Sequence, residues 1–152
     1  MTSSIDFLRA FVWELRRTFR ELAAASDQSL EPLGITVGDR AVLEFLSRES
    51  AAASLSQLAR KHSVSRQHVQ QALRRLPDQA WIETSIDPKD ARTLTVRLSP
   101  DGWRFWDKVQ ATEEDYFGPL AQSADAEEIR RAAEFLRGLR SEIAHFRKLV
   151  RR

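Results

Sequence analysis

The segment SLSQLARKHSVSRQHVQQALRRLP, residues 54–77, contains two short helical patterns separated by a tight break. The first covers Ser54 to Lys61 and the second covers Ser65 to Leu76. Two short helices joined by a turn of about 3–4 residues form a helix-turn-helix, which places its second helix in the major groove of DNA. The interval from Ser50 to Pro77 holds five Lys or Arg residues and no Asp or Glu, as suits a phosphate-binding surface. A solvated basic helix pair in an all-α bundle would explain the same pattern, so the next segments decide between the two interpretations.

Two strand patterns follow, with a polar turn between them. Residues 81–86 and 94–98 are rich in β-branched and aromatic side chains. Asp87–Thr93 is turn-forming and carries two cations near its tip. Asp90 stands two residues before Arg92, so we expect its carboxylate to orient the Arg92 guanidinium. A helix-turn-helix followed by such a hairpin is a winged helix, whose wing can place a basic side chain against phosphates or in the adjacent minor groove.

The second helical pattern has one apolar and one polar face. The apolar stripe, which we expect to be buried, consists of Val69, Ala72, Leu73 and Leu76. At about 100° per residue, the opposite face is centred on Gln67, Gln71 and Arg74, with Gln70 alongside. Glutamine pairs with adenine and arginine with guanine in the major groove, whereas a merely solvated face would be expected to carry Glu and Lys. The predicted DNA-binding residues are Ser65, Arg66, Gln67, His68, Gln70, Gln71, Arg74, Arg75, Lys89, Asp90 and Arg92.

The two ends of the chain carry apolar residues at alternating spacings of three and four. Near the start these are Ile5, Leu8, Val12, Leu15, Phe19 and Leu22, and near the end they are Ile129, Ala132, Leu136, Leu139, Ile143, Phe146 and Val150. Such seams are typical of amphipathic helices. Either helix alone could pack on its own domain, but two terminal seams far from the helix-turn-helix favour an intertwined homodimer interface.

Capping residues and helix breakers divide the chain. The predicted helix starts are Thr36, Ser54 with Gln57, Ser99 before Pro100, and Asp125 with Glu128. The helix after Ser99 is expected to end near Leu120, and Ser50–Ala53 is expected to be a small linker. We predict an N-terminal dimerisation helix at 1–34, a winged helix-turn-helix DNA-binding domain at 35–99, and C-terminal dimerisation helices at 100–152. The predicted fold class is therefore mainly α with a small β-hairpin.

Four short motifs resemble the signature of MarR-type bacterial transcriptional regulators. They are Leu55–Ala59, Val64–Gln67, Asp90–Arg92 and Leu98–Gly102. The resemblance covers essentially the whole chain in length and element order, and its most specific part is the Asp-x-Arg wing followed by a Leu-Ser-x-x-Gly helix entry. It implies a dimeric winged-helix protein, often a repressor, which in many members responds to small aromatic or lipophilic ligands. The chain departs from the usual pattern at Ser63 and Ala80, where glycine is frequent, and at Thr84, where arginine is frequent.

Three of the four tryptophans are candidates for an effector site. In the resembled family, an effector often binds in the crevice between the dimerisation helices and the winged domain, and the resemblance places Trp13 with Trp103 or Trp106 there. Aromatic residues at helical spacing are otherwise core residues, and this alternative stays open. The chain has no cysteine, which excludes disulfides, thiolate zinc sites and thiol redox sensing. His62 and His68 have no matching ligand cluster, so we predict no metal site and no cofactor.

Length and composition fit a globular protein with its own core. The 152 residues are 42% hydrophobic and 30% charged, and the formal net charge is only +2, so attraction to DNA must come from the local basic segment. The first six residues lack a signal-peptide pattern, and no apolar run approaches the roughly 18 residues of a membrane span. We therefore expect a cytoplasmic protein without a membrane partner.

These patterns predict a homodimeric, sequence-specific transcriptional regulator that binds double-stranded DNA at a pseudo-palindromic operator. The resemblance implies a repressor that a small aromatic or lipophilic effector controls. No arrangement of residues indicates catalysis, so we predict no enzyme activity. The alternative is a dimeric winged-helix scaffold that binds protein and shows no salt-dependent affinity for DNA.

Overall fold

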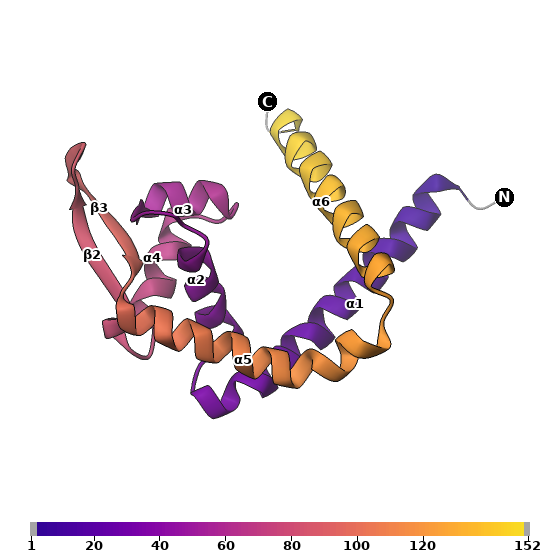
Figure 1. The fold of residues 1–152 in the computed structure, drawn as a ribbon. Coiled ribbons are helices and arrows are strands. Elements are labelled where there is room, and N and C mark those ends of the chain that lie inside the picture. The colour runs from indigo at the N-terminus through magenta and orange to yellow at the C-terminus, as the bar shows by residue number, and fades with distance from the viewer. Residues whose placement is uncertain (1–2, 151–152) are drawn as a thin grey trace. The chain divides into compact units, whose positions relative to one another are not determined.

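The computed structural model describes residues 3–150, which form six helices and one small sheet (Figure 1). The helices are α1 (Ser4–Leu30), α2 (Val37–Ser47), α3 (Leu55–Lys61), α4 (Arg66–Arg75), α5 (Pro100–Ser123) and α6 (Ala126–Leu149). The strands are β1 (Ala53–Ser54), β2 (Ile82–Asp87) and β3 (Asp90–Leu98), and Glu31–Leu33 and Gln79–Trp81 form short 3₁₀ turns. This architecture confirms the predicted mainly α fold with a winged helix-turn-helix. Residues 1, 2, 151 and 152, which belong to the predicted terminal segments, lie outside the described residues.

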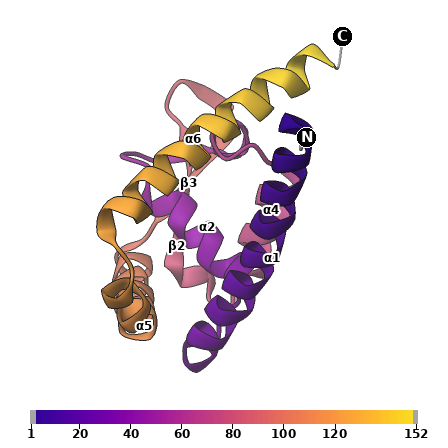
Figure 2. The ribbon, with the colours of Figure 1, turned by 90° about the vertical axis from the view of Figure 1, so that its right-hand side faces the viewer.

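The chain forms two compact units, and the boundary between them falls within α5. Residues up to Glu114 form the first unit, and residues from Asp115 onwards form the second. The first unit contains the sheet, the helix-turn-helix and the uninterrupted helix α1 (Figure 2). The second contains the end of α5 and the helix α6. The functional division at 1–34, 35–99 and 100–152 stays a prediction.

Side-chain caps begin the helices where the sequence predicts. Thr36 Oγ1 accepts the backbone N–H of Asp39 at 3.2 Å, and Ser65 Oγ accepts that of His68 at 3.0 Å. The predicted capping box at the start of α3 is present, because Ser54 and Gln57 exchange backbone-to-side-chain hydrogen bonds. Asp125 accepts the first backbone donors of α6. Each cap satisfies N–H groups that the first helical turn leaves without a partner.

The sheet is antiparallel, in the order β1-β3-β2, and it corrects two predictions. Ser50–Ala53 is not merely a linker, because Ala53 pairs with Val96 in β1. A strand of two residues is too short to show alternation in the sequence. The turn predicted at Asp87–Thr93 is also too long. The strands β2 and β3 continue to Asp87 and from Asp90, so only two residues connect them.

The hydrophobic core of the first unit joins α2, α3, α4, the sheet and the start of α5. Its buried residues are Leu30, Ile35, Val42, Leu43, Leu46, Ala53, Leu58, Ala59, Val69, Ala72, Leu73, Leu76, Trp81, Val96, Leu98, Trp106 and Val109. This set includes the whole apolar stripe predicted for α4. Burial of that stripe fixes which face of α4 is turned outward.

The turn of the helix-turn-helix contains a residue with left-handed backbone conformation. Ser63 has a φ of 57°, a conformation that glycine adopts at the least cost. The departure from glycine noted in the sequence therefore falls where the backbone favours glycine. The fold accommodates it, since the backbone N–H of Val64 still closes the turn on the Ala59 carbonyl at 3.0 Å.

The Leu-Ser-x-x-Gly entry ties α5 to the segment before β2. Ser99 Oγ donates to the Ala80 carbonyl at 2.5 Å and accepts the Gly102 N–H at 3.0 Å. A Cβ atom on Gly102 would overlap the Trp81 carbonyl oxygen and lie 2.9 Å from its carbon. The ring of Trp81 stacks on Phe105, with 3.9 Å between ring centroids. Glycine at position 102 is therefore required by a close approach of two backbones.

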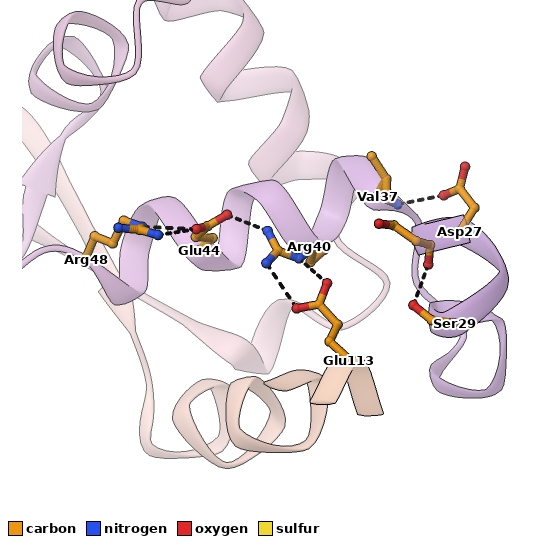
Figure 3. Close-up of polar contacts among 8 residues, drawn as sticks. Asp27, Ser29, Val37, Arg40, Glu44, Arg48 and Glu113 are labelled. Atoms are coloured by element: carbon orange, nitrogen blue, oxygen red, sulfur yellow. Dashed lines mark hydrogen bonds and ion pairs between the residues drawn. The ribbon is translucent and has the colours of Figure 1, made fainter. Parts of the chain in front are cut away.

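An ion network joins α2 to α5 within the first unit (Figure 3). The Arg40 guanidinium donates to both carboxylate oxygens of Glu113, at 2.5 and 3.0 Å, and also to Glu44. Glu44 in turn accepts from Arg48 at 3.1 Å. Hydrogen bonding to Glu113 is the main cause that raises the pKa of Arg40. Because these groups are partly buried, the network holds α5 against α2 more firmly than exposed ion pairs would.

His62, at the C-terminal end of α3, is half-buried. Its ring stacks on Phe45 at a centroid distance of 3.7 Å, and its Nε2 lies 3.9 Å from Glu49 Oε1. Burial lowers the pKa of His62 from its usual 6.5, and the opposing effect of Glu49 is smaller. In the pH range between this lowered pKa of the folded state and 6.5, the unfolded chain therefore binds a proton at His62 that the folded chain does not. The stability that His62 contributes is complete above about pH 6.5 and is lost as the pH falls through the lower, folded pKa.

Replacing His62 with phenylalanine is expected to reduce acid sensitivity. The variant keeps an aromatic ring to stack on Phe45 and has no group to protonate. The decrease in thermal midpoint between about pH 7.5 and pH 5.5 should therefore be smaller in His62→Phe than in the wild type, by a few degrees at most. Circular dichroism melts at both pH values measure this difference. An equal decrease in both proteins would show that His62 does not contribute to acid sensitivity.

Candidate nucleic-acid interface

The outer face of α4 presents the side chains predicted to read bases. Gln67, Gln71 and Arg74 are exposed, and Gln70 is half-buried beside them. Val69 and Leu73, on the opposite face, are only 3% and 7% exposed. The rigid packing of one face therefore aims the other outward, which is the arrangement of a helix that enters the major groove.

Most cations of the helix-turn-helix and the wing have no anionic partner. Within residues 3–150, no carboxylate forms an ion pair with Arg60, Arg66, Arg74, Arg75, Lys89 or Arg92. Lys61 differs, because its Nζ lies 2.7 Å from Glu49 Oε1. The unpaired cations stay fully available to neutralise phosphates, which is the main source of affinity for nucleic acid.

In the wing, Asp90 binds backbone and hydroxyl donors, and the prediction that it orients the Arg92 guanidinium is wrong. Its Oδ1 accepts the backbone N–H of Arg92 at 3.0 Å, and its Oδ2 accepts the Thr93 hydroxyl at 2.8 Å. These bonds, the Arg92 N–H first, lower the pKa of the Asp90 carboxyl. Asp90 thus shapes the start of β3 and leaves the Arg92 guanidinium unneutralised. Lys89 stands at the two-residue tip, where its N–H donates to Asp87.

The structure brings part of the predicted set together around one hollow. Arg66 and Gln70 of α4 and Arg92 of β3 line a cavity of about 190 Å³, together with Ser54, Leu55, Ser56, Thr93 and Leu94. Ser65 caps the start of α4 by accepting the backbone N–H of His68, and Arg74 and Arg75 lie in its last turn. Ser56 was not predicted from the sequence, because a serine in the first turn of a helix carries no distinctive signal. Only the position of the wing shows that Ser56 lines the same hollow as two arginines.

The three tryptophans proposed for an effector site differ in their surroundings. Trp106 is a core residue, 6% exposed, with the Arg40 guanidinium 5.6 Å from its ring centroid. Trp103 is 43% exposed and lines a cavity of about 490 Å³ with Leu46 and Leu98. Trp13 is 61% exposed on α1. Trp106 is therefore a core residue, as the alternative interpretation of the tryptophans states.

Two other classes of site have no counterpart in the described part of the chain. No helix between residues 3 and 150 is both long enough and apolar enough to span a membrane. The same residues contain no group of three or more His, Cys, Asp or Glu side chains arranged to hold a metal ion.

The fold and its unpaired basic face define a winged-helix protein, and the family model for the winged helix DNA-binding domain matches residues 36–102. A MarR family transcription regulator has a similar structure, with a TM-score of 0.78 and 26% identity over 97% of both chains. The chain thus has the fold of MarR-type winged-helix regulators. No curated protein matches it.

Two further solved structures show what proteins of this fold bind. The MepR–DNA complex from S. aureus matches with a TM-score of 0.73 and 20% identity, over 87% of this chain and 97% of that one. CouR from Rhodococcus jostii RHA1, bound to p-coumaroyl-CoA, matches with a TM-score of 0.72 and 17% identity, over 91% and 92%. At these identities the two structures show a shared fold, and their ligands are properties of those proteins. The structural neighbours are transcription regulators and not enzymes.

Proposed function

We propose that the protein is a homodimeric repressor that recognises a pseudo-palindromic operator through α4 and the wing. The observation that carries the proposal is the exposed face of Gln67, Gln71 and Arg74, which the buried stripe of α4 aims away from the core. Two such helices, one from each protomer, would enter successive major grooves about one helical turn apart. Repression itself is inferred from the family resemblance, and the cytoplasmic location belongs to the same proposal.

Exposed apolar residues support the homodimer. On α1, Ile5, Phe7, Leu8, Trp13, Phe19 and Leu22 are between 46% and 68% exposed. On α6, none of the described residues is buried, and Ile129, Phe135, Ile143, Phe146 and Leu149 are at least 50% exposed. Apolar surface on this scale marks an interaction surface. A second copy of the chain, packing along the terminal helices, is the occupant that we propose.

We also propose that a small aromatic or lipophilic effector modulates DNA binding, as the resemblance implies. CouR, with its bound p-coumaroyl-CoA, supports the capacity of this fold to hold such a ligand. Trp13 and Trp103 remain the proposed contacts because their side chains are exposed, whereas Trp106 is already packed in the core. Binding would change the spacing of the two copies of α4 and so their affinity for the operator.

Truncating the α4 face is expected to separate sequence reading from general attraction. Gln67→Ala, Gln71→Ala and Arg74→Ala should each change stability by no more than about 0.5 kcal/mol, because the positions are exposed and are not caps. Discrimination between operator and scrambled duplex should fall by on the order of 1–3 kcal/mol for each side chain that pairs bidentately with a base. Affinity for scrambled duplex should change little for the glutamines and more for Arg74, whose charge also attracts phosphates.

The measurement is a competition titration at fixed salt, on a duplex selected from a random library and on its scrambled form. Arg104→Ala, an exposed α5 arginine paired with Asp101, is the matched control and should leave discrimination unchanged. Proportional loss of specific and non-specific binding in all three α4 variants would mean that this face does not read sequence. A wild-type protein without salt-dependent DNA binding would favour the scaffold alternative.

A further inference from the structure

The hollow between α3, α4 and the wing is lined from three elements that are distant in sequence. Ser56 lies in the first turn of α3, Arg66 and Gln70 lie on α4, and Arg92 lies at the start of β3. Its volume of about 190 Å³ leaves room for a phosphate group with water. The wing and α4 therefore share one concave surface and do not present two separate patches.

The polar groups of this lining suit an anion. The lining residues include two arginines, two serines, a threonine and a glutamine, and no Asp or Glu. The other described cavities each include at least one carboxylate in their lining. The nearest acid in sequence, Asp90, uses its oxygens to bind the Arg92 N–H and the Thr93 hydroxyl. An arginine fork matches two oxygens of one phosphate, and charge-assisted bonds of this kind are among the strongest in proteins.

The two arginines that line this hollow carry like charges, and an anion bound between them would offset their mutual repulsion. Neither Arg66 nor Arg92 has a carboxylate partner within residues 3–150. A bound phosphate would turn this repulsion into attraction from both sides. Both residues belong to the basic face, and DNA is the polyanion that this face is proposed to bind.

We propose that one DNA backbone phosphate binds in this hollow, held by Arg66 and Arg92 together and assisted by the Ser56 hydroxyl. The proposal rests on the proposed DNA-binding function and assigns Arg92 to a phosphate and not to the minor groove. It makes the wing and α4 a single binding unit, because the same phosphate is held from both.

The test is a double-mutant cycle read through salt dependence. Log affinity against log salt falls with a slope of about 0.9 for each neutralised phosphate. If the two arginines share a phosphate, Arg66→Gln with Arg92→Gln should lower the slope by only about 0.9 in total. Two separate phosphates would give about 1.8. The double variant should also bind at least about threefold better than the product of the two single effects predicts, as interacting residues do.

Matched pairs supply the control, because each pair removes two positive charges of which only one belongs to the lining of the hollow. Lys89 belongs to the wing and Arg75 to α4, and neither lines the cavity. Arg66→Gln with Lys89→Gln, and Arg75→Gln with Arg92→Gln, should be additive in affinity and in slope. Ser56→Ala should weaken binding in the wild-type background and have no effect in the Arg66→Gln, Arg92→Gln background.

Two further measurements distinguish a phosphate of the DNA backbone from free inorganic phosphate as the bound anion. Replacing single backbone phosphates of the selected duplex by uncharged methylphosphonates should remove the coupling at one position in each half-site. Inorganic phosphate, titrated at constant ionic strength, should compete only weakly. Strong competition by inorganic phosphate would assign the hollow to a free anion and overturn the proposal. Additive effects of the Arg66 and Arg92 substitutions in a protein that still binds DNA would overturn the shared phosphate site but not the proposed function. A wild-type protein that binds no DNA would contradict both proposals.

Discussion

Gly102→Ala is expected to destabilise the winged domain by at least about 3 kcal/mol. The added Cβ would overlap the Trp81 carbonyl oxygen, which is a backbone atom that cannot rotate away as a side chain can. Relief requires α5 to move from the 3₁₀ turn before β2, and that movement breaks the hydrogen bonds of Ser99 to Ala80 and Gly102. The Trp81–Phe105 stack would separate as well.

Chemical unfolding followed by circular dichroism measures this effect, and the same helix offers a control. Gly118 also lies within α5, but a Cβ there meets no atom within 4 Å. Gly118→Ala should therefore raise stability by up to about 1 kcal/mol, because alanine favours the helix. Equal stability of Gly102→Ala and the wild type would show that the close approach to Trp81 is not required for folding.

Leu139→Glu combined with Ile143→Glu is expected to give a monomeric or unfolded protein. Ile143 is 51% exposed in one protomer and Leu139 is half-buried, one turn earlier on the same face of α6. In the proposed homodimer both would be covered by the partner, so two carboxylates would be buried without counter-charges. Many obligate dimers have no stable folded monomer, so loss of association and loss of structure are both expected results.

Sedimentation and circular dichroism at micromolar concentration distinguish these results from a native dimer. Ser141→Glu is the control, because it adds a carboxylate about 200° round the helix from Leu139. It should leave the dimer intact. A wild-type chain that sediments as a well-folded monomer would contradict the dimer proposal outright.

The helix starts could be predicted closely from the sequence because they depend on local chemistry. Thr36, Ser54, Ser65 and Asp125 each cap the helix that they were expected to begin. The buried stripe of α4 could be predicted equally well, because its apolar residues recur with the period of an α-helix. In both cases the residues that form the signal lie within one or two turns of each other.

The features that the sequence did not predict depend on contacts between distant segments. β1 exists only because Ala53 and Ser54 reach β3, about forty residues later, and two residues cannot show a period. The wing strands are longer than predicted. Their outer residues, such as Arg92 and Thr93, are polar because this part of the hairpin lies away from the core, and so they give no strand pattern in the sequence. The position of Ser56 beside the wing likewise follows from tertiary packing, which also decides between the two interpretations of Trp106 that the sequence left open.

Ser54 belongs to β1 and also caps α3, so the strand passes into the helix without an intervening loop. An insertion of even one residue after Ser54 would rotate the polar face of α3 or shift the register against β3. The stretch before β1, from Ser50 to Ala52, has no such second role and can absorb changes of length. We therefore expect homologous chains to keep the length of this junction, even where the neighbouring segments differ in length. The distance from the wing to α4 would then be the same in these chains.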